Sequence, residues 1–211
     1  MRGAFILKEQ DYDLMLGIKT IEIQQNFNGS PHFHRYEPTP YLLLDRLFEH
    51  SPLNDGDRLV DFGCGKGRLA FYSHYLFGIE AVGVEMNEAF HSDALKNQEE
   101  YLKENRSANG KIHFECALAQ DYAIDSRDNK FYFFNPFSVQ VFMAAVNNIL
   151  RSVEENRREV DIILFFASGD YIDFLENRTA FELIAEIDLP GSEREVRERF
   201  LIYRLPSAGN M

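Results

Sequence analysis

A short glycine-rich segment in the first third of the chain constrains its fold more than any other part of the sequence. The apolar run Leu59–Phe62 is followed by alternate glycines at Gly63, Gly65 and Gly67, and a helical pattern begins at Leu69. A strand, a tight glycine turn and a helix form the nucleotide-binding corner of an α/β sheet. Because glycine permits positive φ angles and close ligand approach, the segment predicts a ligand site rather than a turn with no ligand.

The spacing of the glycines separates three classes of nucleotide site. A P-loop needs a lysine and a hydroxyl residue after its last glycine, but Lys66 precedes Gly67 and Arg68 follows it. The dinucleotide motif G-x-G-x-x-G would place its third glycine at Arg68. The observed order, D-x-G-x-G-x-G, begins with Asp61. A carboxylate repels pyrophosphate, so Asp61 favours S-adenosylmethionine, which has cationic groups and no phosphate; an aspartate that only caps the turn is the alternative.

A second carboxylate ends the next expected strand. Glu85 closes the run Ala81–Glu85 and follows Gly63 by 22 residues. In nucleotide-binding sheets an acidic residue about 20 residues beyond the first glycine binds the ribose hydroxyls. The two acids together predict a site for a cationic adenosine compound at the ends of neighbouring strands.

Two stretches carry a family resemblance. Val60–Arg68 and Gly83–Asn87 resemble the first two motifs of class I S-adenosylmethionine-dependent methyltransferases, and the similarity spans about residues 38 to 168. Tyr36–Pro40 also resembles the Y-x-P-T-P segment of some seven-strand lysine methyltransferases. The resemblance implies methyl transfer from S-adenosyl-L-methionine to an amine of a protein side chain or small molecule. The alternatives are a domain that binds this cofactor as a sensor or partner without catalysis, and an NAD-dependent oxidoreductase.

The resemblance also implies which residues bind the cofactor. Asp61 would lie toward its amino-acid end, Glu85 would hold the ribose and Met86 would lie against adenine. A side chain after the third strand, Gln120 or Asp121, would accept a hydrogen bond from the adenine amine. The full implied set is Thr39, Asp61, Gly63, Cys64, Gly65, Gly67, Glu85, Met86, Gln120 and Asp121.

An aromatic strand predicts the acceptor site. Lys130–Phe137 ends in Asn135-Pro136-Phe137, similar to the D/N-P-P-Y/F motif of amino-group methyltransferases but with one proline fewer. In those enzymes carbonyl groups hold the acceptor amine and the aromatic ring stacks on the acceptor. We therefore expect Asn135, Pro136 and Phe137 at the catalytic site, with Asn135 orienting the acceptor, against the alternative of a turn that only closes a buried strand. His34, Tyr36 and Glu37 are the candidates for a general base.

The length of 211 residues predicts a single domain, and the alternation of strand and helix patterns predicts α/β class with a mostly parallel sheet. Residues 1–50 would form an N-terminal extension and a lead-in helix, and residues 51–211 a Rossmann-like core. The resemblance implies that the doubly wound sheet has seven strands, and the last two strand patterns predict an antiparallel C-terminal hairpin. Within the extension, Ile18–Ile23 alternates like a short strand, Thr39 is expected to cap the lead-in helix, and His32–Tyr36 is a candidate loop over the cofactor. The other expected helices and strands are Tyr41–His50, Asn87 to about Asn105, Ile112–Leu118, Val139–Leu150, Val160–Phe166, Asp170–Asn177, Phe181–Leu189 and Arg199–Leu205.

Charge and composition limit the partners. The net charge is −12 and no long basic run occurs, which disfavours nucleic acid because such binding depends on neutralising phosphates. No apolar run approaches the ~18 residues of a membrane span. The only cysteines are Cys64 and Cys116, and we expect a reduced, cytoplasmic protein. We expect no metal site, since His32 and His34 have no third ligand nearby.

Overall fold

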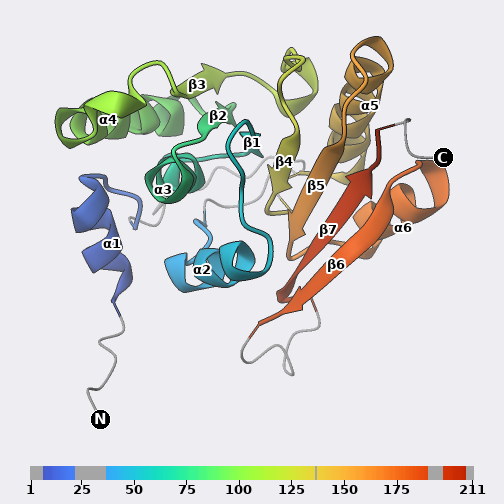
Figure 1. Ribbon diagram of the computed structural model, residues 1–211, viewed down its shortest axis with the longest axis horizontal. Helices are drawn as coiled ribbons and strands as arrows, with labels where there is room; N and C mark the ends of the chain where they lie inside the picture. The colour runs from blue at the N-terminus through green and yellow to red at the C-terminus, as the bar shows by residue number, and fades with distance from the viewer. Residues whose placement is uncertain (1–6, 22–36, 136, 190–196, 208–211) are drawn as a thin grey trace.

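The computed structural model describes residues 7–21, 37–135, 137–189 and 197–207 (Figure 1). The helices, including two short 3₁₀ segments, are α1 (Glu9–Leu16), α2 (Tyr41–His50), α3 (Arg68–Phe77), α4 (Glu88–Glu104), η1 (Arg106–Ala108), η2 (Ala119–Asp121), α5 (Val139–Glu155) and α6 (Gly169–Arg178). The strands are β1 (Arg58–Phe62), β2 (Glu80–Glu85), β3 (Ile112–Cys116), β4 (Lys130–Phe133), β5 (Val160–Phe165), β6 (Glu182–Asp188) and β7 (Arg199–Leu205).

The strands form one seven-stranded sheet in the order β3-β2-β1-β4-β5-β7-β6. Strands β1 to β5 are parallel to one another, whereas β7 runs antiparallel to both β5 and β6. The predicted doubly wound sheet and its antiparallel C-terminal pair are therefore confirmed. The chain order reverses between β1 and β4, and open α/β sheets bind ligands beyond the carboxyl ends of the strands at such a point.

Helices cover both faces of the sheet (Figure 1). Side chains of α1, α2, α3 and α4 contribute to one apolar cluster, and those of α5, α6 and η2 to the other. Alternate residues of a strand point to opposite faces, so on β1 Leu59 belongs to the first cluster and Val60 to the second. Asp61, in phase with Leu59, points into the side covered by the N-terminal helices.

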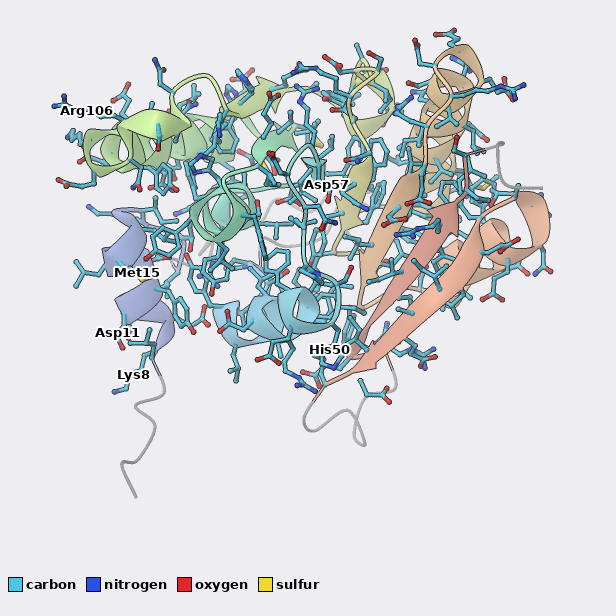
Figure 2. All side chains as sticks on the ribbon, in the orientation of Figure 1. Lys8, Asp11, Met15, His50, Asp57 and Arg106 are labelled. Carbon is cyan, nitrogen blue, oxygen red and sulfur yellow. The ribbon has the colours of Figure 1, made fainter. Side chains whose placement is uncertain are left out.

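The N-terminal segment differs from expectation. Helix α1 was not predicted, and the expectation of a strand over Ile18–Ile23 is wrong for residues 18–21, which lie in no strand. Asp13 is buried and accepts hydrogen bonds from the amide (2.6 Å) and the hydroxyl (2.8 Å) of Thr20. These bonds fold the chain back on α1 and occupy a donor that a sheet ladder would need. The labelled side chains of Lys8, Asp11 and Met15 lie on the exposed side of α1 (Figure 2).

The start of α2 corrects the role expected for Thr39. The cap position is Pro40, which forms no side-chain cap. The Thr39 hydroxyl instead shares a 2.7 Å hydrogen bond with the Tyr132 hydroxyl on β4, and Glu9 accepts a hydrogen bond from the Tyr41 amide at 3.0 Å. Thr39 therefore joins the lead-in segment to the sheet, while α1 supplies a partner for the free amide at the start of α2.

Candidate functional site

The glycine turn after β1 has an unusual backbone. Gly63, Gly65 and Gly67 have φ angles of 82°, 55° and 86°, a backbone conformation that residues other than glycine rarely adopt. A Cβ atom at Gly67 would lie 2.5 Å from the Phe114 ring. The space beside Gly67 is thus filled by the protein itself, and the need for glycine at this position comes from packing as well as from backbone angle.

Asp61 is a buried acid beside this turn. Asp61 is buried, with a relative exposure of 6%. Among the described residues, its carboxylate makes no hydrogen bond and no ion pair. Burial, with a smaller contribution from the negative charge of Glu85, raises the pKa of Asp61 to about 8. A buried carboxyl group that lacks a cation is costly to ionise. A cationic ligand would remove that cost.

Glu85 ties the end of β2 to the glycine turn. Its carboxylate accepts hydrogen bonds from the amides of Gly65 (2.9 Å) and Asn87 (2.7 Å). Burial raises the pKa of Glu85, and these backbone donors oppose the rise. A carboxylate has about four acceptor positions, so Glu85 can hold the turn in place and still accept from two hydroxyl groups.

The residues expected around adenine differ in what they can contact. Met86 follows β2 and is 38% exposed, so one side of its thioether is free to cover a planar ring. Gln120 lies in η2, and its buried side-chain oxygen has no hydrogen-bond partner among the residues that the structure describes. The backbone carbonyl oxygen of Gln120 accepts a hydrogen bond from the Asn148 side chain at 2.6 Å, and this bond fixes the backbone. Asp121 is exposed, and Cys64 is a buried free thiol.

Thr39, Tyr132 and Arg68 connect the lead-in segment to the sheet and to the glycine turn. Tyr132 pairs with Asp61 in the β1–β4 register and shares its hydroxyl bond with Thr39. Arg68, the first residue of α3, donates to the Thr39 carbonyl at 3.1 Å and to Glu9, and its guanidinium lies 4.3 Å from the centre of the Tyr41 ring. The lead-in segment is therefore fixed to the helix that starts at the glycine turn.

A pocket of about 390 Å³ opens beyond the carboxyl ends of β4 and β5. Asn135, one of its lining residues, has a φ of 38°, and Phe166, which follows β5, has a φ of 55°. Two non-glycine residues in this conformation, at corresponding positions of neighbouring strands, indicate a backbone arranged for a site. The lining residues are Glu37, Pro40, Leu43, Phe134, Asn135, Phe165, Phe166, Arg197 and Glu198.

The structure brings only part of the expected acceptor motif to this pocket. Asn135 lines it, whereas Phe137 is buried at 6% exposure in the cluster under α5 and α6, and its carbonyl accepts from the Tyr171 hydroxyl at 2.8 Å. Pro136 lies outside the described residues. The rings at the pocket are those of Phe134, Phe165 and Phe166.

Of the three candidate bases, Glu37 lines the pocket, and His34 and Tyr36 lie outside the described residues. Sequence reasoning missed Arg197 and Glu198, which stand in a charged run far along the chain. It also missed Phe166, although a residue directly after a buried strand is a recognisable position for a site. Within the described part of the chain, no group of three or more metal-binding side chains gathers, and none of the helices there is long and apolar enough to cross a membrane.

Comparison with known proteins supports the fold. No family model matches the chain. A protein-lysine N-methyltransferase of Saccharolobus islandicus is 37% identical over 65 residues, which is 30% of this chain and only 40% of that protein.

Solved structures match over more of the chain. An RNA methyltransferase from Salinibacter ruber, solved with S-adenosyl-L-homocysteine, has a TM-score of 0.52 and 22% identity, over 83% of this chain and 96% of its own. The cyclase SpnF has a TM-score of 0.58 and 15% identity, over 79% of this chain and 82% of its own. At these identities the similarity shows the Rossmann-like methyltransferase fold, and one fold hosts more than one reaction.

Proposed function

We propose that this chain binds S-adenosyl-L-methionine and transfers its methyl group to an amine of a protein side chain or small molecule. The observation that carries the proposal is Asp61, a buried carboxylate beside the glycine turn that makes no ion pair within the described residues. A cationic ligand without phosphate is the chemistry that such a position favours. The Salinibacter ruber structure, which has this fold and holds S-adenosyl-L-homocysteine, supports the same ligand class.

The residues around the turn fit the parts of this cofactor. In the proposal Asp61 binds the ammonium group of the amino-acid end, near Thr39. Glu85 accepts from the ribose hydroxyls, and its bonds to the Gly65 and Asn87 amides hold it in place. Met86 covers adenine, and the unpartnered side-chain oxygen of Gln120 accepts from the adenine amine. An adenine amine would satisfy a buried acceptor that is otherwise costly to leave alone.

The transfer asks for positioning more than for covalent chemistry by the protein. When bound, the cofactor would supply an electrophilic methyl group to the lone pair of a neutral acceptor amine, with the carbon–sulfur electrons left on sulfur. An acceptor that enters as an ammonium would first lose a proton to solvent, and the methylated amine would lose a second. Asn135 orients the amine through its side-chain oxygen, and holding reacting atoms about 3–3.5 Å apart accounts for much of the rate gain. Glu37 is exposed at the pocket and can pass the lost proton to solvent.

The similarity to a lysine methyltransferase over 65 residues favours an amine as acceptor. The solved relative that acts on RNA shows that this fold also serves nucleic acid. The net charge of −12 weighs against a polyanion for this chain. An oxidoreductase is disfavoured because a diphosphate would lie beside Asp61.

Two measurements on the purified protein test the proposal. Calorimetric titration with S-adenosylmethionine, S-adenosylhomocysteine and NAD separates the cofactor classes, and binding of NAD alone would end the proposal. Transfer of radiolabelled methyl groups to a cell extract, fractionated into protein, nucleic acid and small molecules, identifies the acceptor. Binding of the cofactor with no label in any fraction would favour the non-catalytic sensor.

A further inference from the structure

We infer that the pocket beyond β4 and β5 selects an acceptor with an alkyl chain that ends in an ammonium group, and that Glu37 and Glu198 determine this specificity. The inference rests on the proposed function, since it names the substrate class of the same site. The chemistry is shared by a lysine side chain and a free diamine.

The pocket lies next to the residues that would hold the methyl donor. Thr39 bonds to Tyr132, the register partner of Asp61, at 2.7 Å, while Pro40, the next residue, lines the pocket. Adjacent residues of the lead-in segment therefore border both the proposed cofactor site and the pocket. Asn135, two residues beyond the end of β4, lines the pocket from the sheet side.

The inner wall of the pocket is apolar and aromatic. The ring centres of Phe134 and Phe165 are 4.5 Å apart, and those of Phe165 and Phe166 are 6.3 Å apart. Leu43 and Pro40 add aliphatic surface from α2 and its cap. A methylene chain gains free energy when it is buried against such a wall, and aromatic rings also attract an ammonium group.

The charges of the pocket favour a cation. Among the described residues, two carboxylates, those of Glu37 and Glu198, line the pocket together with one guanidinium, that of Arg197. Glu37 comes from the segment before α2 and Glu198 from the segment before β7. The Arg197 guanidinium lies over the Phe166 ring at 4.5 Å from its centre. The lining thus has an excess of one negative charge, and its two acids come from segments far apart in the chain.

The excess negative charge would repel a phosphate group or a carboxylate that entered the pocket, whereas it would attract an ammonium group. A neutral nucleobase could use the aromatic wall but would gain nothing from the two acids. The pocket therefore discriminates by charge at its acidic residues and by shape at its rings.

Binding to the full chain tests the inference without turnover. The probes are Nα-acetyl-lysine methylamide and cadaverine, which represent the two sources of an alkylammonium, and Nα-acetyl-norleucine methylamide, which lacks the ammonium. We expect both amines to bind at least tenfold more tightly than the norleucine compound, and Glu37→Gln and Glu198→Gln each to weaken amine binding about tenfold. Glu182→Gln, an exposed substitution on edge strand β6, is the matched control and should change nothing.

Each result of these titrations either supports or overturns the inference. Equal binding of the lysine and norleucine compounds, unchanged amine binding in both glutamine variants, or tighter binding of free cytosine or adenine than of cadaverine would overturn the inference. S-adenosylhomocysteine titration of the same variants should give wild-type affinity. If S-adenosylhomocysteine fails to bind the wild type while the amines bind, the proposed function fails and the charge selectivity of the pocket stands; if only the amines fail, the reverse holds.

Discussion

Buried carboxylates have different partners at the two edges of the parallel sheet: in the part of the chain that the structure describes, cations surround them at the amino edge but not at the carboxyl edge. At the amino edge, Asp161 is 2% exposed and accepts from Lys130 (2.6 Å) and Arg204 (2.7 Å), and these cations lower its pKa despite burial. At the carboxyl edge, Asp61 is also buried, at 6% exposure, but has no cationic partner within the described residues, and its pKa is raised. Aspartates on β1 and β5, two strands separated by β4, thus differ: the one at the amino edge is paired with cations, and the one at the carboxyl edge is not.

The rest of the amino edge follows the same rule. Arg58 donates to the fully buried Asp128 at 2.7 Å, and although burial still raises the pKa of Asp128, the arginine opposes the rise. Asp57, labelled in Figure 2 just before β1, accepts from Asn129 at 2.8 Å. Removing one partner of a buried ion pair is destabilising, because it leaves a buried charge without a partner. Asp61, which has no cationic partner among the described residues, therefore marks the edge where a cationic ligand would complete the site.

The largest expected effect is loss of the amino-edge pairing. Asp161→Asn leaves Lys130 and Arg204 without their shared anion, and removing one partner of a buried pair costs about 3–5 kcal/mol. The matched substitution Asp61→Asn removes no cation contact and should leave the protein without ligand at least as stable at neutral pH. Urea unfolding measures the free energy of unfolding of both variants. Equal destabilisation would contradict the proposed difference between the two edges.

The second prediction concerns pH. The pKa of Asp61 is about 8 in the folded state and about 3.9 in an unfolded chain, so between these values the folded state holds more protons. The contribution of Asp61 to stability therefore falls as pH rises, by at most about 1.4 kcal/mol per pH unit. We expect the stability gained by Asp61→Asn relative to wild type to be larger at pH 8 than at pH 6 in urea unfolding. A constant difference would mean that Asp61 is not the group that titrates.

The third prediction asks whether Asn135 belongs to the chemistry. Asn135→Gly keeps the positive φ angle at no steric cost and removes only the side-chain amide. Loss of one hydrogen bond to a reacting amine should lower turnover about tenfold to a hundredfold, with unchanged affinity for S-adenosylhomocysteine. Single-turnover kinetics and calorimetry measure the two quantities, and equal loss of both would move Asn135 to the cofactor site. Asn135→Ala should lower turnover in the same way, at an additional cost in stability from backbone strain.

The smallest expected effect separates burial from ion pairing. Arg127 bonds to Glu80 at 2.9 Å at the amino edge, but its side chain is 59% exposed. Exposed pairs contribute little because water screens them. Arg127→Ala should leave the urea midpoint unchanged within error, and a clear loss would show that pairing at this edge stabilises without burial.

The sheet and the glycine turn could be predicted because their signals are local. Alternation, strand length and the order of strands and helices are visible along the chain, and so are two acids at the ends of consecutive strands such as Asp61 and Glu85. The pocket could not be predicted in the same way. Glu198 and Phe166 line the same pocket because Phe165 pairs with Phe200 across β5 and β7, a contact between residues far apart in sequence.

The same reason explains the N-terminal errors. The bond between Thr39 and Tyr132 and that between Asp13 and Thr20 depend on how α1 and the lead-in segment pack on the sheet. Phe137 looked like a pocket residue from its motif, and its burial depends on α5 and α6 covering that face. Side-chain direction after a strand follows from tertiary packing, which a local pattern does not contain.

The most direct test of the central claim is proton release when S-adenosylhomocysteine binds. At pH 7 the Asp61 carboxyl group without ligand is mostly protonated, because its pKa is about 8, and a bound ammonium group would ionise it. Calorimetry in buffers of different ionisation enthalpy should therefore show release of nearly one proton by the wild type, and none, with weaker binding, by Asp61→Asn. Tight binding with no proton released, and with the same affinity in Asp61→Asn, would contradict the account.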